Sequence, residues 1–209
     1  LAIAGERQHC LAVLLIDLDD FKTVNDSLGH AAGDALIIEM ARRIGRVLAP
    51  VDTAGRLGGD EFVVLLESCG DIAGVERAAT TLVDTIRRPM TIEGRELVVQ
   101  ASIGIALAGP NDDDAASLLR NADIAMYAAK ERGRAGFVVF DSSMMRRASD
   151  RLGLVADLHR AIERGEISVA YQPIVSLDDE SIGGLEALVR WTHPARGNIK
   201  PNAFIHLAE

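Results

Sequence analysis

A continuous apolar run near the start of the chain limits the available folds more than any other feature. Leu11–Ile16 contains no polar residue and leads directly into Asp17. A run of this length suits a strand, and an unbroken apolar strand is one that is buried on both faces. Such strands lie in the middle of a sheet that is covered by helices. The run therefore predicts an α/β fold with Asp17 at the end of a central strand.

Three later segments carry the repeat of an amphipathic helix. Apolar residues recur at four-residue spacing or close to it in 36–48, 75–86 and 118–129, which places them on one face of a helix in each case. Asp71 precedes the second of these segments and is expected to cap that helix. The three segments predict helices that each bury one face against a sheet.

Strand patterns alternate with these helices. Phe62–Leu66 and Phe137–Phe140 are expected to be strands, and 91–107 is expected to hold a hairpin that turns at Glu93-Gly94-Arg95. The expected order is strand, helix, strand, helix, hairpin, helix, strand. This order predicts a layered α/β domain of ordinary size, which ends near Asp141.

The chain changes character after Asp141. Ser142–Gly165 is charged and predicts a linker helix, whose apolar face consists of Leu154, Leu158, Ala161 and Ile162. Two further strands are expected at Ile167–Val175 and Leu185–Trp191. The residues from Ile167 to Glu209 are too few for these strands to build a hydrophobic core of their own. We expect three parts, at 1–141, 142–165 and 166–209.

Composition restricts the partners and the setting. The net charge of −9 disfavours non-specific binding to nucleic acid, which needs clustered Lys and Arg. No apolar run is long enough to cross a membrane, and Leu1–Cys10 lacks the apolar centre of a signal peptide. Cys10 and Cys69 are too few for a disulfide framework or a zinc site, so we expect reduced thiols. These features together favour a cytoplasmic protein.

Two acidic clusters follow or precede predicted strands. The first contains Asp17, Asp19 and Asp20, and the second is the Gly-Gly-Asp-Glu sequence at 58–61, which is expected at a hairpin tip. Each could be a solvated turn, because Asp and Gly are common turn residues. Taken together, they could instead hold Mg²⁺, which prefers carboxylates and substrate phosphates.

Other nucleotide and hydrolase motifs are missing from the sequence. It contains no P-loop, no G-x-G-x-x-G and no G-x-S-x-G, and its five histidines show no H-E-x-x-H spacing. Phosphoryl transfer can proceed without a P-loop when two metal ions activate the attacking hydroxyl and neutralise the leaving phosphate. The acidic clusters are therefore the main candidates for chemistry.

Three ordered blocks resemble one family. Gly58-Gly59-Asp60-Glu61-Phe62 spells the signature of GGDEF diguanylate cyclases, and 17–34 is similar to that family's D-x-D-x-F-K-x-x-N-D-x-x-G-H-x-x-G-D pattern. The third block consists of Ala122-Asp123, Tyr127, Ala129-Lys130 and Gly133-Arg134. The resemblance covers Cys10 to about Asp141. It implies a central, mostly antiparallel sheet flanked by helices.

The resemblance also implies an enzyme that condenses two GTP into cyclic di-GMP and pyrophosphate, with Mg²⁺ or Mn²⁺. By matching position, Asp17 and Asp60 are the implied metal ligands, and the Leu18 carbonyl assists. Asp60 is implied to activate the ribose 3′-hydroxyl, with Glu61 beside it as a second acid. A homodimer is implied, because each ribose hydroxyl attacks the α-phosphate of the partner's GTP.

The same matching implies the substrate contacts. Asn25 and Asp34 would read the guanine edge, and Asp can accept hydrogen bonds from guanine N–H groups. The implied phosphate contacts are the main chain at Phe21 and Lys22 and the side chains of Lys22, Lys130 and Arg134. Gly58 and Gly59 would allow a ligand close to the backbone. His30 is either structural or a contact near the guanine.

The sequence departs from the family pattern in two places. Many members carry an inhibitory R-x-x-D site, where this chain reads Ala49-Pro50-Val51-Asp52. Without the Arg, phosphate loses a bidentate donor, so we expect weak or absent product inhibition. The family's D-x-L-T-G-L-x-N-R segment is missing from Leu1–Cys10.

The last part resembles the start of an EAL phosphodiesterase domain. The matching blocks are 171–175, Glu186-Ala187-Leu188, Arg190-Trp191, His193-Pro194 and 201–209. By position Glu186 is an implied metal ligand, and Gln172 and Arg190 are implied substrate contacts. A barrel of this kind needs roughly 200 residues, so we expect no hydrolysis by this part alone. The alternative to an active cyclase is a silent GTP-binding domain that regulates the phosphodiesterase, and a third reading is a scaffold that binds no nucleotide.

Overall fold

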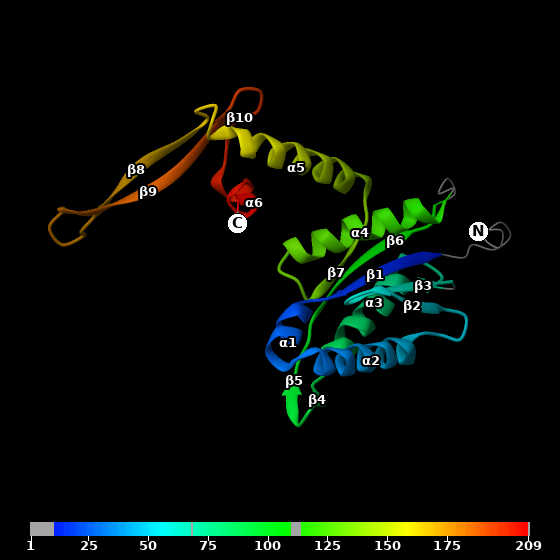
Figure 1. Cartoon of the computed structure of the whole chain (residues 1–209). Helices are drawn as coiled ribbons and strands as arrows, with labels where there is room; N and C mark the ends of the chain where they lie inside the picture. Colours follow the sequence, from blue (N-terminus) through cyan, green and yellow to red (C-terminus); the bar gives the residue numbers. More distant parts are fainter. Residues whose placement is uncertain (1–10, 68, 110–113, 209) are drawn as a thin grey trace. The chain divides into compact units, whose positions relative to one another are not determined.

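The computed structural model describes residues 11–67, 69–109 and 114–208, and the chain divides into two compact units between Met145 and Arg146 (Figure 1). The first unit is built on a five-stranded sheet with the order β2-β3-β1-β6-β7. Its strands are β1 (Ala12–Leu18), β2 (Thr53–Gly58), β3 (Glu61–Leu66), β6 (Ala101–Leu107) and β7 (Gly136–Val139). Neighbouring strands are antiparallel except β6 and β7, which are parallel. The expected mostly antiparallel sheet is confirmed.

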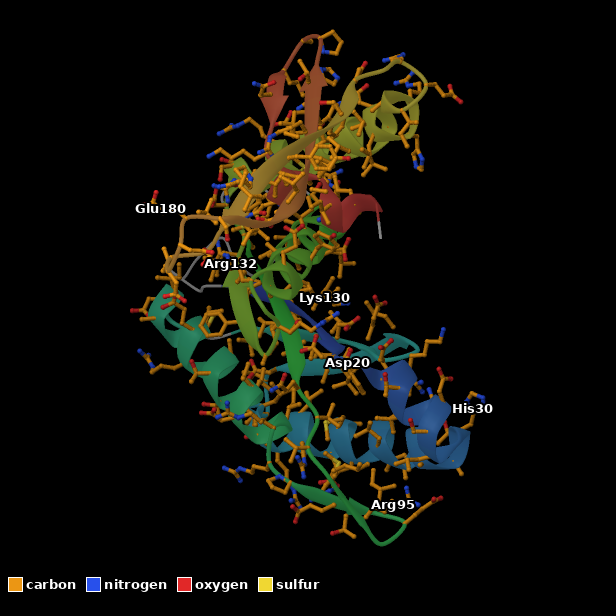
Figure 2. The ribbon with its side chains drawn as sticks, turned by 90° about the vertical axis from the view of Figure 1, so that its left-hand side faces the viewer. Asp20, His30, Arg95, Lys130, Arg132 and Glu180 are labelled. Atoms are coloured by element: carbon orange, nitrogen blue, oxygen red, sulfur yellow. The ribbon has the colours of Figure 1, made fainter. Side chains whose placement is uncertain are left out.

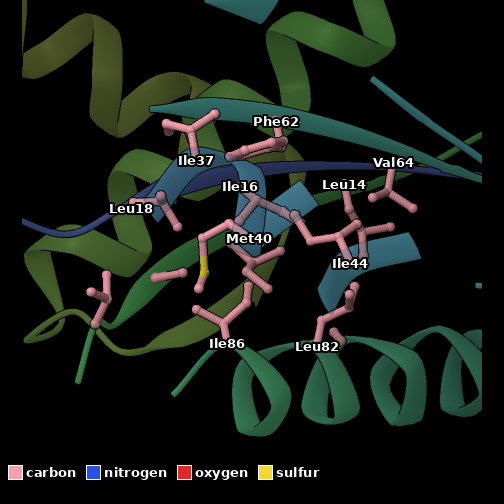
Figure 3. Close-up of a cluster of buried hydrophobic side chains, with 14 of the residues drawn as sticks. Leu14, Ile16, Leu18, Ile37, Met40, Ile44, Phe62, Val64, Leu82 and Ile86 are labelled. Carbon is pink, nitrogen blue, oxygen red and sulfur yellow. The ribbon is translucent and has the colours of Figure 1, made fainter. Parts of the chain in front are cut away.

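Helices cover both faces of β1, which explains its unbroken apolar sequence. The helices of this unit are α1 (Phe21–Leu28), α2 (His30–Val47), α3 (Ile72–Ile86) and α4 (Ala115–Glu131). Leu14, Ile16 and Leu18 belong to one buried cluster with residues of α2 and α3 (Figure 3). Val13 and Leu15, on the opposite face, pack with residues of α4. Asp17 follows in the same alternation as Val13 and Leu15, so it is placed on the α4 face.

Two local predictions are confirmed in detail. The Asp71 carboxylate accepts a hydrogen bond of 2.8 Å from the Gly74 N–H and caps α3. The expected hairpin is formed by β4 (Met90–Ile92) and β5 (Arg95–Leu97), with positive φ at Glu93 and Gly94. This hairpin is a separate two-stranded sheet and does not extend the central one.

A buried arginine joins α2 to the end of α3. The Arg43 guanidinium donates hydrogen bonds of 2.5–3.2 Å to the carbonyl oxygens of Thr85, Ile86, Arg88 and Pro89. Thr85 and Ile86 are the last residues of α3, where a helix leaves its carbonyl acceptors unsatisfied, and the other two carbonyls follow the helix. Glu39 pairs with Arg42 and Arg43, and these guanidinium groups lower the pKa of Glu39 to about 2. These contacts fix the position of α2 relative to the end of α3.

The second unit contains a long helix and a long hairpin. Its elements are α5 (Ser142–Ala161), which begins before the division, β8 (Ile167–Val175), β9 (Ile182–His193), β10 (Gly197–Ile199), the 3₁₀ turn at Pro201–Ala203 and α6 (Ile205–Ala208). Ala161, Trp191 and Phe204 form a small buried cluster. No helix in the described ranges is both long and apolar enough to cross a membrane.

The expected apolar face of α5 is wrong at one position. Leu154 and Leu158 pack against the small cluster around Trp191, and Ala161 belongs to it. Ile162 is 78% exposed, because α5 ends at Ala161 and the chain turns away there. The helical repeat cannot continue through a residue that is outside the helix.

Candidate functional site

Four parts of the first unit meet at one edge of the central sheet: the end of β1, the β2–β3 turn, the start of β6 and the chain after α4. The Leu18 N–H donates to the Asp60 carbonyl at 3.3 Å, which joins the end of β1 to the turn. Asp17 is directly opposite Glu61 on β3 and Ser102 on β6. Residues that are opposite on antiparallel strands point to the same face. The two acidic clusters of the sequence are therefore brought together.

Asp17 is part of β1 and buried, so the reading of it as a solvated turn is wrong. Its Oδ2 is 2.7 Å from the Lys130 Nζ, which comes from the last turn of α4. Burial raises the pKa of Asp17, the Lys130 ammonium lowers it in part, and the carboxylates of Asp60 and Asp19 raise it again. The Asp17 carboxylate is therefore placed between one cation and two like charges.

This pair suits a hard cation that also binds a substrate. Among the described residues there is no group of three or more His, Cys, Asp or Glu side chains that could hold a metal ion. Mg²⁺ usually takes one or two carboxylates from a protein and completes its shell with water and phosphate oxygens. Asp17 and Asp60 match that pattern, and Lys130 now supplies the positive charge beside Asp17.

The start of α1 presents main-chain donors next to these acids. α1 begins at Phe21, after Asp20, which has a left-handed backbone with φ of 58° and makes no capping hydrogen bond with its side chain. Figure 2 marks Asp20 at the start of α1 and Lys130 at the end of α4. The first N–H groups of a helix have no acceptor within it, and they favour anions. The N–H groups of Phe21 and Lys22 are in this position.

The proposed guanine contacts come from α1 and α2. An ideal Cβ at Gly33 would be 2.0 Å from the Asn25 Oδ1, so the carboxamide of α1 lies directly over the backbone of α2. Asp34 is the next residue of α2 and is exposed, as is His30 at the helix start (Figure 2). An exposed His30 has no core role. Asn25 and the Asp34 backbone are brought close together by this packing.

The tip of the β2–β3 hairpin consists of Gly59 and Asp60, because Gly58 is the last residue of β2 and pairs with Glu61. Gly59 has a φ of +52°, in the left-handed region that favours glycine. The Arg56 guanidinium donates to the Gly59 carbonyl through Nε at 3.0 Å and Nη2 at 2.6 Å. The register shifts between Arg56 and Gly58. The turn that carries Asp60 is therefore held from β2.

Sequence reasoning missed two features of this edge. One is α1, which at eight residues is too short to show a full helical repeat. The other is a network around Asp19, whose carboxylate binds the Ser102 hydroxyl on β6 and the Ala135 N–H after α4. Asp19 was visible within an acidic cluster, but no sequence signal connects it with Ser102 or Ala135.

Asp52 has a structural role. Its Oδ2 accepts from the Ala49 N–H at 2.9 Å, and its Oδ1 accepts from the Glu67 N–H at 3.1 Å. Both carboxylate oxygens thus hold the chain where β2 begins beside the end of β3. These two hydrogen bonds account for an Asp at position 52 without any bound ligand.

The second unit brings together two of its candidate residues. Gln172 of β8 is directly opposite Glu186 of β9, and both side chains are exposed, as is Arg190. The hairpin also exposes large apolar side chains, among them Tyr171 and Leu185, at 65% and 61%. No second layer covers them within the described residues.

Comparison with known families identifies both parts of the chain. The profile described as "Diguanylate cyclase, GGDEF domain" matches residues 1–136, and the profile "EAL domain" matches residues 155–209. The first match covers β1–β6 and α1–α4 and ends at Gly136, the first residue of β7, so it contains the site described above.

Two curated relatives are similar over the full chain. The bifunctional diguanylate cyclase/cyclic di-GMP phosphodiesterase MucR of Pseudomonas aeruginosa is 45% identical over 208 residues, which are 100% of this chain and 30% of that protein. The cyclic di-GMP phosphodiesterase PdeR of Escherichia coli is 39% identical over 208 residues, which are 31% of its length. The chain thus spans about a third of each relative.

Solved structures of GGDEF domains have the same fold as the first unit. A GGDEF-only form of YfiN (TpbB) from Pseudomonas aeruginosa matches with a TM-score of 0.67 and 39% identity, over 70% of this chain and 86% of that one. The GGDEF domain of DgcB from Caulobacter crescentus, in complex with c-di-GMP, matches with a TM-score of 0.58 and 32% identity. It covers 66% of this chain and 82% of that one.

Proposed function

Because the chain belongs to the GGDEF family of diguanylate cyclase domains, with an EAL match after it, we propose that it condenses two GTP molecules into cyclic di-GMP and pyrophosphate. One observation carries the proposal: the hydrogen bond from the Leu18 N–H to the Asp60 carbonyl places Asp60 beside the end of β1, where the Asp17 carboxylate contacts the Lys130 ammonium. This edge has the charges that phosphoryl transfer needs. We also propose that the cyclase domain ends near Asp141 and is followed by a linker over residues 142–165, which contains α5.

The proposed mechanism gives each residue one task. Asp17 and Asp60, with the Leu18 carbonyl, would hold Mg²⁺ or Mn²⁺, which when bound neutralises phosphate and acidifies the ribose 3′-hydroxyl. Asp60 takes the proton of that hydroxyl, with Glu61 beside it as a second acid. The O3′ of each GTP attacks the α-phosphorus of the other GTP, and each attack breaks the bond to one pyrophosphate, so two pyrophosphates leave as the ring closes.

The cations and the polar side chains of α1 and α2 bind and orient GTP in this proposal. Lys130 leaves Asp17 for a phosphate when a metal takes its place, and Lys22 and Arg134 hold other phosphate oxygens. The N–H groups of Phe21 and Lys22 add donors, and Gly58 and Gly59 let the nucleotide approach the backbone. Asn25 and Asp34 bind the guanine edge, with His30 as a weak contact nearby. Because one site holds one GTP, a second copy of the chain must supply the other.

The test is to incubate the purified chain with GTP and Mg²⁺ and to detect cyclic di-GMP by mass. We expect product, and we expect the rate per protein to fall when the chain is diluted into the monomer range. A rate per protein that stays constant on dilution would contradict the homodimer.

The second candidate is a catalytically silent GTP-binding domain that regulates a phosphodiesterase. It is favoured by the names of two similar proteins, NbdA and PdeR, which mention only phosphodiesterase activity. GTP binding without any product would support this candidate. An interaction scaffold would bind no GTP at all. We propose that residues 166–209, including Glu186, do not hydrolyse cyclic di-GMP by themselves.

Gly33→Ala is expected to weaken GTP binding about tenfold, the effect of losing roughly one good hydrogen bond. The new methyl group would meet the Asn25 Oδ1, which is the end of a flexible side chain and can rotate away without unfolding the domain. Titration with GTP and ATP should then show a smaller preference for GTP.

Gly45→Ala is the matched control, because it is in the same helix and its Cβ would meet nothing within 4 Å. We expect its GTP affinity to equal that of the parent. If Gly33→Ala keeps full affinity and full preference for GTP, Asn25 does not read the guanine.

Asp52→Ala is expected to affect stability and not product inhibition. It removes the acceptor of the Ala49 and Glu67 N–H groups, which should cost about 1–2 kcal/mol of unfolding free energy. Urea unfolding measures this loss, and the cyclase rate with added cyclic di-GMP should be nearly the same in both proteins. Tight cyclic di-GMP binding that disappears in the variant would show that an inhibitory site exists at Asp52.

A further inference from the structure

Asp19 is a buried acid for which the proposed chemistry has no use. Its side chain is only 2% exposed. The Oδ1 accepts from the Ser102 hydroxyl at 2.8 Å, and the Oδ2 accepts from the Ala135 N–H at 3.2 Å. The Asp19 N–H donates to the Gln100 carbonyl at 2.9 Å. This one residue therefore joins the chain after β1 to the start of β6 and to the loop after α4.

The loop after α4 needs support of this kind. Gly133, Arg134 and Ala135 have φ values of 108°, 63° and 55° in succession. Glycine adopts such values freely, but the left-handed conformation costs free energy in an L-residue, because its Cβ comes too close to the following carbonyl oxygen. Arg134 and Ala135 both bear this cost. The hydrogen bond from the Ala135 N–H to the Asp19 carboxylate stabilises the second of the two strained residues.

Arg134 is carried by the same loop. Its Nε is 3.8 Å from the Asp19 Oδ1, yet the side chain is 54% exposed, so most of the guanidinium is open to a ligand. Lys130 is four residues earlier, at the end of α4, and contacts Asp17. The position of the loop therefore decides where the second cation stands relative to the end of β1.

Asp19 differs from its neighbour Asp17 in its partners. Both Asp19 oxygens already accept hydrogen bonds from the protein, one from a side chain that is fully buried. Within the described part of the chain, the side-chain partner of the Asp17 carboxylate is the flexible Lys130 ammonium. A carboxylate with two fixed protein donors is suited to holding a loop, and one with a movable partner is suited to exchange.

We propose that Asp19 is a positioning residue, which holds residues 133–135 against the end of β1 and so places Arg134 for the phosphates of the nucleotide. It acts through the loop and does not touch the substrate. The inference rests on the proposed function, because that function puts phosphate at Arg134.

The test compares the binding of GTP and of guanosine to the Asp19→Asn variant. The amide has nearly the same size but no negative charge, so its hydrogen bond to the Ala135 N–H is weaker than that of the carboxylate. We expect GTP to bind about tenfold more weakly, and guanosine, which has no phosphate, to bind as it does to the parent. Asp84→Asn, a surface acid on α3 paired with Arg87, is the control and should change neither affinity.

A double-mutant cycle with Arg134→Ala separates positioning from general stability. If Asp19 acts through Arg134, the variant with both changes should bind GTP no more weakly than Arg134→Ala alone. Additive losses, or an equal loss of guanosine binding in Asp19→Asn, would overturn the proposal. A parent protein that binds no GTP would instead refute the proposed function itself.

A second variant covers the case in which Asp19→Asn does not fold. Ser102→Ala removes the donor on β6 that fixes the Asp19 carboxylate, so the carboxylate no longer keeps one orientation toward the Ala135 N–H. Weaker GTP binding with unchanged guanosine binding in Ser102→Ala supports the proposal. Unchanged binding of both ligands overturns it.

Discussion

Gly104→Ala is expected to lower the unfolding free energy of the first unit by about 3 kcal/mol or more, at the upper end of overpacking effects. An ideal Cβ at Gly104 would be 2.0 Å from the Ala122 carbonyl oxygen, 2.1 Å from the Met126 nitrogen and 2.7 Å from the Met126 Cα. These are backbone atoms of α4, so no side chain can rotate to make room. Either β6 or α4 must move.

The movement would open the core on this face of the sheet. Gly104 is opposite Leu15 on β1, and α4 packs with Leu15 and Val13 through Leu118, Ala122 and Met126. A shift of α4 loses these contacts and also moves Lys130, so activity should fall with stability. Small domains have few kcal/mol to lose, so much of the variant should be unfolded at growth temperature.

Urea unfolding, monitored by circular dichroism, measures the loss of unfolding free energy in Gly104→Ala. Gly45→Ala again serves as the matched control, because its Cβ would meet nothing within 4 Å. Since Gly in the interior of a helix costs about 1 kcal/mol relative to Ala, the control should be as stable as the parent or more so. An unchanged urea midpoint in Gly104→Ala would mean that α4 does not approach β6 closely.

Asp60→Asn is expected to reduce cyclic di-GMP formation at least about a thousandfold, as the loss of a metal ligand and a base together would. Asn keeps the size of the side chain, and the hydrogen bond from Leu18 uses the Asp60 backbone carbonyl, so the turn should be unchanged. The amide cannot take a proton and is a poor ligand for Mg²⁺. Product is measured by mass after incubation with GTP and Mg²⁺.

Asp84→Asn is the control for the loss of one negative charge, since Asp84 is an exposed partner of Arg87 on α3. It should form product at the parental rate. GTP binding by Asp60→Asn should persist, because the proposed guanine and phosphate contacts are on other residues. A rate above about a tenth of the parent in Asp60→Asn, a loss well short of that expected of a base, would exclude Asp60 from that role.

Local patterns predicted most of the first unit. The apolar run at 11–16 identified β1 because every position of that strand is buried, by helices on one face or the other. The capping Asp71 and the turn at Glu93-Gly94 were predictable because their hydrogen bonds and dihedral angles depend on residues only a few positions away. Ile162 was predicted wrongly, because periodicity shows which residues share a face and not where the helix ends.

The candidate site also has features that the sequence predicts and features that only the structure shows. A resemblance of three blocks named its residues, and the signature at 58–61 located the hairpin tip, where Gly59 adopts a positive φ. The sequence could not indicate that Asp17 is buried against Lys130, or that the Asn25 carboxamide lies over Gly33. Both contacts depend on how α1 and α4 pack on the rest of the domain.

The sequence by itself determined the family, most of the order of strands and helices, and the identity of the acidic and basic residues of the candidate site. Only the tertiary structure decided which of them meet. Asp19 contacts Ser102 and Ala135, which are 83 and 116 positions away along the chain. Neither contact has a periodic or local signal, because it exists only when β1, β6 and α4 are packed together. The positioning of Arg134 is a consequence of that packing.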